Sequence, residues 1–180
     1  MLNKKDSLIE ELIAQIASGN TTSMGKLYEL IKTDVYAYAL SKLANIVDAE
    51  DITHDTFVLI YKYAKQYKPM GKPLAWIFRI ELNLIRKHYN DNKNKVSFDE
   101  AILAKPTELD FSTQIVNSEF INEIMCSLNV DEREVISLHV VSGLKHREIA
   151  KLLEKPLSTI LSKYNRAIKK LQAYKGEVEK

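Results

Sequence analysis

Residues 143–171 read GLKHREIAKLLEKPLSTILSKYNRAIKKL and contain two helical patterns on either side of Lys155-Pro156. Gly143 precedes the first pattern and the proline marks the turn after it, because neither residue favours a helix interior. The second pattern, residues 155–171, holds no acidic residue. Two helices joined by a tight turn, the second one basic, are typical of a helix-turn-helix. The stretch therefore predicts a small DNA-binding domain.

The second helix of this pair has an apolar and a polar face when successive residues are placed about 100° apart. The apolar positions, which would seat the helix on a core, are Ile160, Tyr164, Ala167, Ile168 and Leu171. The polar half carries donors and no carboxylate, and comprises Ser158, Thr159, Ser162, Lys163, Asn165, Arg166, Lys169 and Lys170. Such a face can enter a major groove and set its lysines over phosphates. The alternative, a helix whose lysines only confer solubility, is less favoured because a helix-turn-helix spacing precedes it.

Leu161 falls at the edge of the apolar face. It could extend the core, or it could touch a thymine methyl group in the major groove. The sequence leaves both alternatives open.

The composition predicts an all-α protein. The chain has 180 residues, 46% of them hydrophobic, with only five Gly and four Pro, so it can form one domain or two small ones. A single cysteine, Cys126, excludes an internal disulfide and a multi-cysteine zinc site. No apolar run approaches the roughly 20 residues that span a bilayer, and Glu10 and Glu11 interrupt the apolar N-terminal stretch. We therefore expect a cytoplasmic protein that is not inserted in a membrane.

The net charge of +2 conceals blocks of opposite sign. Residues 44–60 carry four acids and no Lys or Arg; residues 61–95 carry nine bases against two acids. Residues 96–135 carry nine acids against two bases, and residues 143–175 carry nine bases against two acids. Two separate basic blocks predict two contacts with a polyanion, whereas the acidic stretches indicate another role.

Apolar periodicity predicts helices in both halves of the chain. In the first half we expect them near residues 8–16, 23–43, 48–66 and 73–92, with Asp48 as an N-cap and a break at residues 67–73. In the second half we expect them at residues 113–128, at 131–141 with a cap near Asp131, and in the helix-turn-helix pair. The predicted organisation is two small helical domains, residues 1–92 and 113–180, joined by a flexible linker at residues 93–112.

Several motifs together resemble bacterial RNA polymerase sigma factors of the extracytoplasmic-function (ECF) type. Residues 143–150 (GLKHREIA) and 156–167 (PLSTILSKYNRA) are similar to the family's helix-turn-helix pattern. Residues 48–57 (DAEDITHDTF), 24–39 (MGKLYELIKTDVYAYA) and 76–80 (WIFRI) are similar to patterns of its first domain. These motifs occur in the family's order and at its separations over most of the chain.

The resemblance implies a function and assigns surfaces to it. Such a protein binds core RNA polymerase at its clamp helices and flap, recognises promoter −10 and −35 elements, and assists melting. The implied core-binding residues are Asp48, Asp51, His54 and Asp55. The implied −10 residues, in a loop that captures a flipped-out base and in the next helix, are Tyr67, Lys68, Lys72, Arg79, Asn83, Arg86 and Lys87. The implied −35 residues are the polar half of the last helix together with Leu161. Whether an anti-sigma factor restrains the protein is left open.

The sequence departs from the family pattern at four positions. Lys145 stands where the family prefers a capping Ser, and His54 where it prefers Gln. Leu161 replaces a usual basic residue and Lys163 replaces an Arg. Lysine lacks the rigid fork with which arginine reads guanine, so these changes bear on the promoter sequence that is read.

Two other classes of function are less favoured by the sequence. A helix-turn-helix regulator that binds duplex DNA without polymerase would need a dimerisation surface, whereas the first half offers a basic loop and an acidic helix. An enzyme is disfavoured because the four histidines are scattered and no glycine-rich phosphate loop or paired metal-ligand motif is present. We therefore expect no catalysis, cofactor, metal or small-molecule substrate. Trp76, on an apolar helix face, is expected in the core rather than as a stacking platform.

Overall fold

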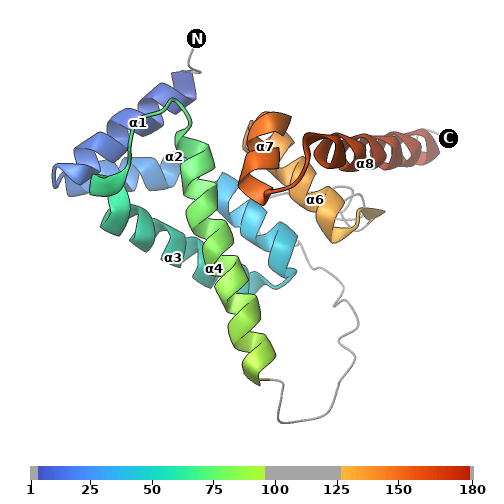
Figure 1. Cartoon of the computed structure of the whole chain (residues 1–180), viewed down its shortest axis with the longest axis horizontal. Coiled ribbons are helices and arrows are strands. Elements are labelled where there is room, and N and C mark those ends of the chain that lie inside the picture. Colours follow the sequence, from blue (N-terminus) through green and yellow to red (C-terminus); the bar gives the residue numbers. More distant parts are fainter. Residues whose placement is uncertain (1–3, 96–126, 179–180) are drawn as a thin grey trace.

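The computed structural model describes residues 4–95 and 127–178, and that part of the chain is helical without a strand (Figure 1). The N-terminal helices are α1 (Lys4–Ala17), α2 (Thr21–Leu43), α3 (Ile46–Tyr63), the short 3₁₀ turn η1 (Ala64–Gln66) and α4 (Pro73–Lys95). The C-terminal helices are α6 (Val130–Ile136), the wide turn η3 (Ser137–Val141), α7 (His146–Leu153) and α8 (Leu157–Val178). None of the described helices is both long and apolar enough to cross a membrane.

The N-terminal helices form a bundle around large apolar side chains. Ile13, Leu27, Ile31, Ile60 and Ile77 are completely buried between α1, α2, α3 and α4. Burying each of these side chains stabilises the fold by about 1.5–3 kcal/mol relative to leaving it exposed. The i, i+3, i+4 spacing of such residues predicted these four helices, and their existence is confirmed.

Asparagine side chains cap three of the helices. Asn20 accepts a hydrogen bond from the N–H of Ser23, and Asn45 accepts one from the N–H of Asp48. Asn129 and Glu132 form a reciprocal capping box at the start of α6. The predicted cap at Asp48 is therefore wrong, because Asn45, three residues earlier, already satisfies the first free N–H groups of α3. The cap predicted near Asp131 is Asn129.

Helix α4 extends to Lys95, beyond the predicted end near residues 88–92. The Tyr89 hydroxyl donates to the carbonyl of Lys42 in α2, and His88 Nε2 lies 3.4 Å from Asp48 Oδ2 in α3. These contacts hold the last turns against the bundle, and no Gly or Pro interrupts them. The remainder of the predicted linker, and residues 113–126 of the helix predicted after it, lie outside the described residues.

The C-terminal helices contain the predicted helix-turn-helix in α7 and α8. Gly143 precedes α7 with φ +72°, and Glu154 ends it with φ +55°, so both turns use left-handed backbone. The stretch predicted as one helix at residues 131–141 is helical throughout: α6 continues at Ser137 into η3, a π-helical turn, where the N–H of Ser142 bonds the Ser137 carbonyl at 3.2 Å. The chain reverses direction after η3, at Gly143, and leads into α7.

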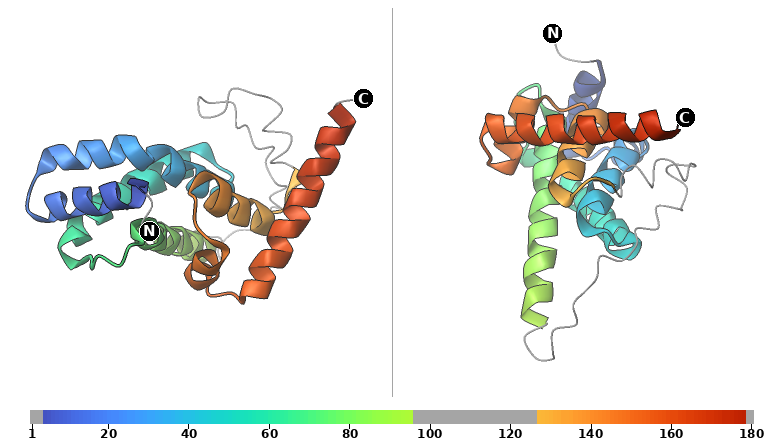
Figure 2. Two further views of the ribbon diagram at one scale, coloured as in Figure 1. Left: turned by 90° about the horizontal axis from the view of Figure 1, so that it is seen from above. Right: turned by 90° about the vertical axis from the view of Figure 1, so that its right-hand side faces the viewer.

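The two halves share one continuous core. Val135, Leu138, Leu144, Ile149 and Leu152 of the C-terminal half belong to the same buried cluster as the N-terminal bundle. Helix α6 packs on α2 and α7 packs on α4, while α8 lies at the end of the molecule opposite α1 (Figure 2). The sequence predicted separate helical units but did not predict these contacts between them.

Candidate nucleic-acid interface

The loop between η1 and α4 is held by one carboxylate of α1. Glu10 Oε1 accepts hydrogen bonds from the Tyr67 hydroxyl and from the backbone N–H of Gly71, both at 2.8 Å. Gly71 has φ +70°, which a residue without a Cβ adopts at little cost. The Tyr67 ring lies 4.9 Å from the Trp76 ring, centroid to centroid. The loop is therefore anchored near both of its ends.

This loop and the start of α4 line a hollow of about 480 Å³. Four of the predicted −10 residues line it, namely Tyr67, Lys68, Lys72 and Arg79. The other three, Asn83, Arg86 and Lys87, are exposed further along α4 and do not line it. The structure thus brings aromatic and cationic groups together around a space, as single-strand binding requires.

Trp76 packs against the core, as expected, but it is only half-buried and also lines the hollow. A core position and a stacking position were alternatives in the sequence analysis, because the helical spacing of Trp76 places it with the apolar residues of α4. In the structure Trp76 does both: it packs on the core and lines the hollow.

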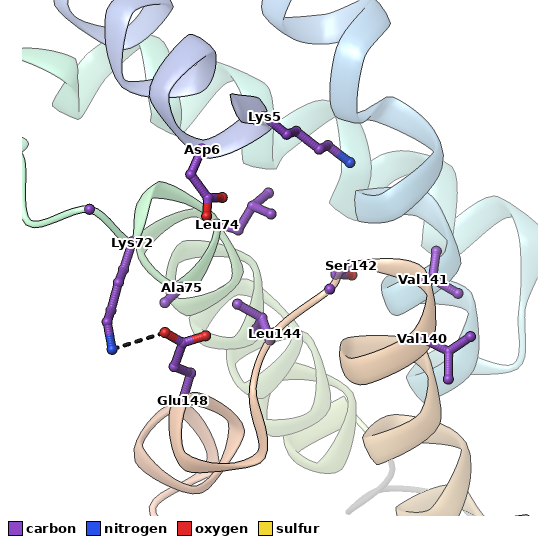
Figure 3. Close-up of a pocket in the computed structure, with 12 residues that line it drawn as sticks. Lys5, Asp6, Lys72, Leu74, Ala75, Val140, Val141, Ser142, Leu144 and Glu148 are labelled. Atoms are coloured by element: carbon purple, nitrogen blue, oxygen red, sulfur yellow. Dashed lines mark ion pairs between the residues drawn. The ribbon is translucent and has the colours of Figure 1, made fainter. Parts of the chain in front are cut away.

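Helix α7 covers one side of the same hollow with Glu148, Lys151 and Leu152. Lys72 Nζ lies 2.9 Å from Glu148 Oε1, an ion pair drawn as a dashed line in Figure 3. That figure shows a neighbouring pocket, which Lys72 and Glu148 also line. Arg79 lies 3.5 Å from a Glu154 oxygen and donates to the Lys151 carbonyl at 3.0 Å. Two of the predicted DNA-contacting cations are therefore paired with the helix-turn-helix.

The position of Glu148 favours its ionised form. Partial burial acts to raise its pKa, but hydrogen bonds from the Lys72 ammonium and from the Lys145 backbone N–H outweigh burial and lower the pKa below its usual value. The bond from Lys145 N–H also retains half of a capping box, although Lys145 has no side-chain acceptor. The capping Ser that the family prefers at position 145 is thus partly replaced by the bond between Glu148 and the Lys145 backbone.

The outer face of α8 forms a second candidate surface. Its exposed side chains border one shallow depression: Ser158, Leu161, Ser162, Asn165, Arg166 and Lys169. Leu161 is 38% exposed, so it belongs to this face and does not extend the core. The depression contains donors and one apolar group but no carboxylate.

The remaining predicted residues of α8 lie elsewhere. Lys163 is only 9% exposed, and its ammonium lies 2.6 Å from Asp131 Oδ2 of α6, so its predicted place on the outer face is wrong. Lys170 pairs with Glu132 at 2.7 Å, and Thr159 is half-buried. Helical periodicity gives the angle of a side chain but not the neighbouring helix, and here α6 presents two acids to this side of α8.

The exposed face of α3 combines acids with apolar groups. Asp51, His54 and Asp55 are exposed as predicted, and His54 Nδ1 lies 3.7 Å from Asp55 Oδ1. Asp48, the fourth residue predicted for this surface, is less exposed than the other three: it is half-buried and lies against His88. Three further residues that the sequence did not assign to this surface are also exposed: Val47, Val58 and Tyr61. Residues 47, 51, 54, 58 and 61 are alternately four and three positions apart, which is typical of a helix that packs along another helix. This spacing is the sequence signal that could have predicted the apolar part of the surface.

Among residues 4–95 and 127–178, no three His, Cys, Asp or Glu side chains gather closely enough to hold a metal ion.

Two sequence families match the chain, one in each half. The family described as "Sigma-70 region 2" matches residues 27–95, and the family described as "Sigma-70, region 4" matches residues 121–171. The chain belongs to the sigma-70 family. The first match contains the α3 surface and the side of the hollow formed by its loop and α4, and the second contains α7 and the outer face of α8.

Curated relatives of this sigma-70 family chain are ECF sigma factors. It is 23% identical over 168 residues to "ECF RNA polymerase sigma factor BldN" of Streptomyces coelicolor, covering 89% of this chain and 63% of that protein. It is 23% identical over 171 residues to "ECF RNA polymerase sigma factor SigK" of Mycobacterium sp. (strain KMS), covering 91% and 89%. The chain thus spans less than two thirds of BldN but most of SigK.

Two solved structures have the same fold as this sigma-70 family chain. The structure of CnrH in complex with the cytosolic domain of CnrY aligns with a TM-score of 0.61 and 26% identity, over 92% of this chain and 96% of that one. The sigma factor RpoE of Bartonella quintana, in complex with the anti-sigma factor NepR, aligns with a TM-score of 0.63 and 22% identity, over 83% and 94%. The second likeness concerns the fold alone.

Proposed function

We propose that this chain is a sigma factor that binds core RNA polymerase and directs it to promoters, recognises −10 and −35 elements, and assists promoter melting. One observation carries the proposal: a single chain matches both sigma-70 regions and places a distinct surface on each. The region 2 match carries the acidic α3 face and the basic hollow, and the region 4 match carries the donor face of α8. We propose no catalysis and no cofactor for it, and a place in the cytoplasm with the polymerase.

The outer face of α8 is proposed to read the −35 element in the major groove. Ser158, Ser162, Asn165 and Arg166 can donate to base edges or phosphates, and no carboxylate on this face repels the backbone. Leu161 would meet a thymine methyl rather than a guanine, which favours an A·T pair opposite it. Lys163 is not included, because its ammonium is paired with Asp131.

The hollow at α4 is proposed to receive a flipped-out base of the −10 element. Lys68, Lys72 and Arg79 can neutralise the strand's phosphates, and the Tyr67–Trp76 pair offers aromatic surface for a base. Asn83, Arg86 and Lys87 would extend this contact along α4. Base capture at this point would help to keep the strands apart.

The exposed face of α3 is proposed to bind the clamp helices of core polymerase. Asp51, His54 and Asp55 supply polar and negative groups, and Val58 and Tyr61 supply apolar area in line with them. A helical partner with basic and apolar residues complements such a face. The helix-turn-helix half would contact the flap, as the family resemblance implies.

An anti-sigma factor is proposed as a further partner. The structure of Bartonella quintana RpoE holds the anti-sigma factor NepR, and that of CnrH holds the cytosolic domain of CnrY. Binding of a protein that stabilises contact between the two halves of this chain would keep the hollow at α4 covered by α7.

A co-elution experiment tests the proposed function. The purified chain is mixed with bacterial core polymerase and passed over a size-exclusion column. We expect a stable complex of the two and weak binding of duplex DNA by the free chain. A chain that binds duplex DNA tightly alone and does not bind core polymerase is instead a helix-turn-helix regulator.

A further inference from the structure

Glu10 lies on α1, ahead of the region 2 match at residues 27–95. Its side chain is half-buried and points to the loop that precedes α4 rather than to solvent. One carboxylate oxygen, Oε1, accepts both of the bonds that anchor this loop, from the Tyr67 hydroxyl and from Gly71 N–H. A carboxylate beside a basic surface opposes DNA binding unless local hydrogen bonds stabilise its charge. Here the carboxylate of Glu10 accepts two hydrogen bonds from the loop.

The two bonds fix two different parts of the hollow. The bond from Tyr67 fixes the ring that lies 4.9 Å from Trp76, so the aromatic wall of the hollow is held in one position. The bond from Gly71 fixes the left-handed turn just before Lys72, a cation that lines the same hollow. Burial, followed by the bond to Glu10, raises the pKa of Tyr67, so its hydroxyl stays protonated and donates at neutral pH.

We propose that Glu10 is a positioning residue for base capture: it holds Tyr67 and Gly71 so that the hollow has one fixed shape before a base enters. This inference rests on the proposed role of the hollow in −10 recognition. A preformed pocket discriminates between bases better than a mobile one, because no binding energy is spent on ordering it. Loss of Glu10 should therefore reduce base preference more than it reduces binding.

Three single variants separate positioning from general stability. Glu10→Ala removes both bonds, whereas Glu10→Gln keeps an oxygen that can accept one or both of them without the charge. Glu11→Ala is the matched control, because Glu11 is on the same helix but exposed, and its carboxylate accepts a hydrogen bond from Gln15 on α1 itself. Thermal unfolding of each full-length variant reports whether the bundle remains folded.

The first readout is the fluorescence of Trp76, which is the single tryptophan of the chain. We expect Glu10→Ala to shift its emission to longer wavelength, because release of Tyr67 opens the indole to water. Glu10→Gln should lie between Glu10→Ala and the wild type, and Glu11→Ala should match the wild type.

The second readout is base preference in the holoenzyme. Fork-junction DNA with a randomised non-template overhang is selected on core polymerase loaded with each variant, and the bound strands are sequenced. We expect the strongest single-base preference of the wild type to fall about tenfold in Glu10→Ala, which corresponds to about 1.4 kcal/mol, to recover in part in Glu10→Gln, and to be unchanged in Glu11→Ala.

The outcomes distinguish the two levels of the proposal. A wild type that selects no base at any overhang position overturns the role of the hollow in −10 recognition, and this inference with it. A wild type with clear base preference and a folded Glu10→Ala variant with the same preference overturn only the role of Glu10. If Glu10→Ala does not fold, Tyr67→Phe decides, because it removes the bond from Tyr67 to Glu10 but keeps the ring: a folded Tyr67→Phe variant with wild-type preference and emission would overturn the role of Glu10, and a reduced preference would support it.

Discussion

Glu81 is completely buried in the N-terminal bundle, and neither of its carboxyl oxygens has a partner in hydrogen-bond geometry. Burial raises its pKa well above the usual value, and the nearby Ala39 backbone offsets this only in part. The folded chain therefore holds a proton that the unfolded chain loses near the ordinary pKa of a glutamate. Because the native state binds more protons, the free energy of unfolding should fall as pH rises from that value toward the raised one.

Glu81→Gln replaces this carboxyl by a neutral amide of the same shape. We expect the variant to lose a pH dependence of up to about 1.4 kcal/mol per pH unit, the largest slope that one proton produces. Urea unfolding of both proteins at several pH values between 5 and 8 measures the slope. A variant with the same slope as the wild type would show that Glu81 does not titrate in this range.

Lys163 illustrates how far single residues could be placed from the sequence. Its angle on the helical wheel predicted an outward position, and the same method correctly placed Asn165 and Arg166. The difference lies in α6, whose Asp131 attracts the lysine ammonium and is itself held at a lowered pKa by that hydrogen bond. A contact between residues in different helices is not encoded in the periodicity of either one.

Helix α8 allows a paired test of these two positions. Arg166→Ala should weaken binding to the −35 element about tenfold, because a good contact to a base is worth about 1–3 kcal/mol. Lys163→Met should leave that affinity nearly unchanged and lower the free energy of unfolding by about 1 kcal/mol, since it removes one member of an ion pair whose other member is half-exposed. Footprinting of the holoenzyme and urea unfolding measure the two effects, and the reverse pattern would restore Lys163 to the DNA surface.

Helix α3 is tested by reversing its charge. Asp51→Lys combined with Asp55→Lys should weaken core binding about tenfold through slower association, because charges at the rim of an interface mainly steer encounter. Glu11→Lys combined with Glu29→Lys, at exposed positions of α1 and α2, adds the same positive charge elsewhere and is the control. Co-elution and association rates at two salt concentrations measure the effect, and equal rates for the reversal and the wild type would place the polymerase contact elsewhere.

At the scale of the element, helices and turns were largely predictable from the sequence, whereas their ends were not. Gly143 and Pro156 marked the turns around α7 correctly, since both act through local backbone geometry. The far end of α4 was predicted too early: no Gly or Pro in residues 88–95 stops the helix, which continues to Lys95. Val58 and Tyr61, the exposed apolar residues near the end of α3, could not be told from buried ones by apolar periodicity alone.

At the scale of the whole molecule, the structure shows one closed arrangement of two halves. Lys72 and Arg79 are paired with Glu148 and Glu154 of the helix-turn-helix half. These pairs could not be predicted from the sequence, because each member looks like an ordinary surface charge. If Lys72 and Arg79 contact the −10 strand, α7 must move away from α4 when the holoenzyme binds a promoter.

This opening is measurable in the free chain. Glu148→Gln combined with Glu154→Gln should favour the open arrangement by about fivefold, since two ion pairs at roughly half a kcal/mol each contribute about 1 kcal/mol together. Affinity for single-stranded DNA at low salt should rise by a similar factor, and small-angle scattering should give a larger radius of gyration. Glu11→Gln combined with Glu29→Gln makes the same change in net charge away from α7. Equal DNA affinity in the two double variants would mean that these pairs do not limit access to the hollow.

Transcription initiation by reconstituted holoenzyme tests the central claim most directly. Core polymerase with and without this chain is supplied with genomic DNA fragments, and the 5′ ends of the RNA products are sequenced. We predict transcripts that require the chain, that start at discrete sites, and that share two sequence elements upstream of those sites. Transcripts that are the same with and without the chain would contradict its assignment as a promoter-specific sigma factor.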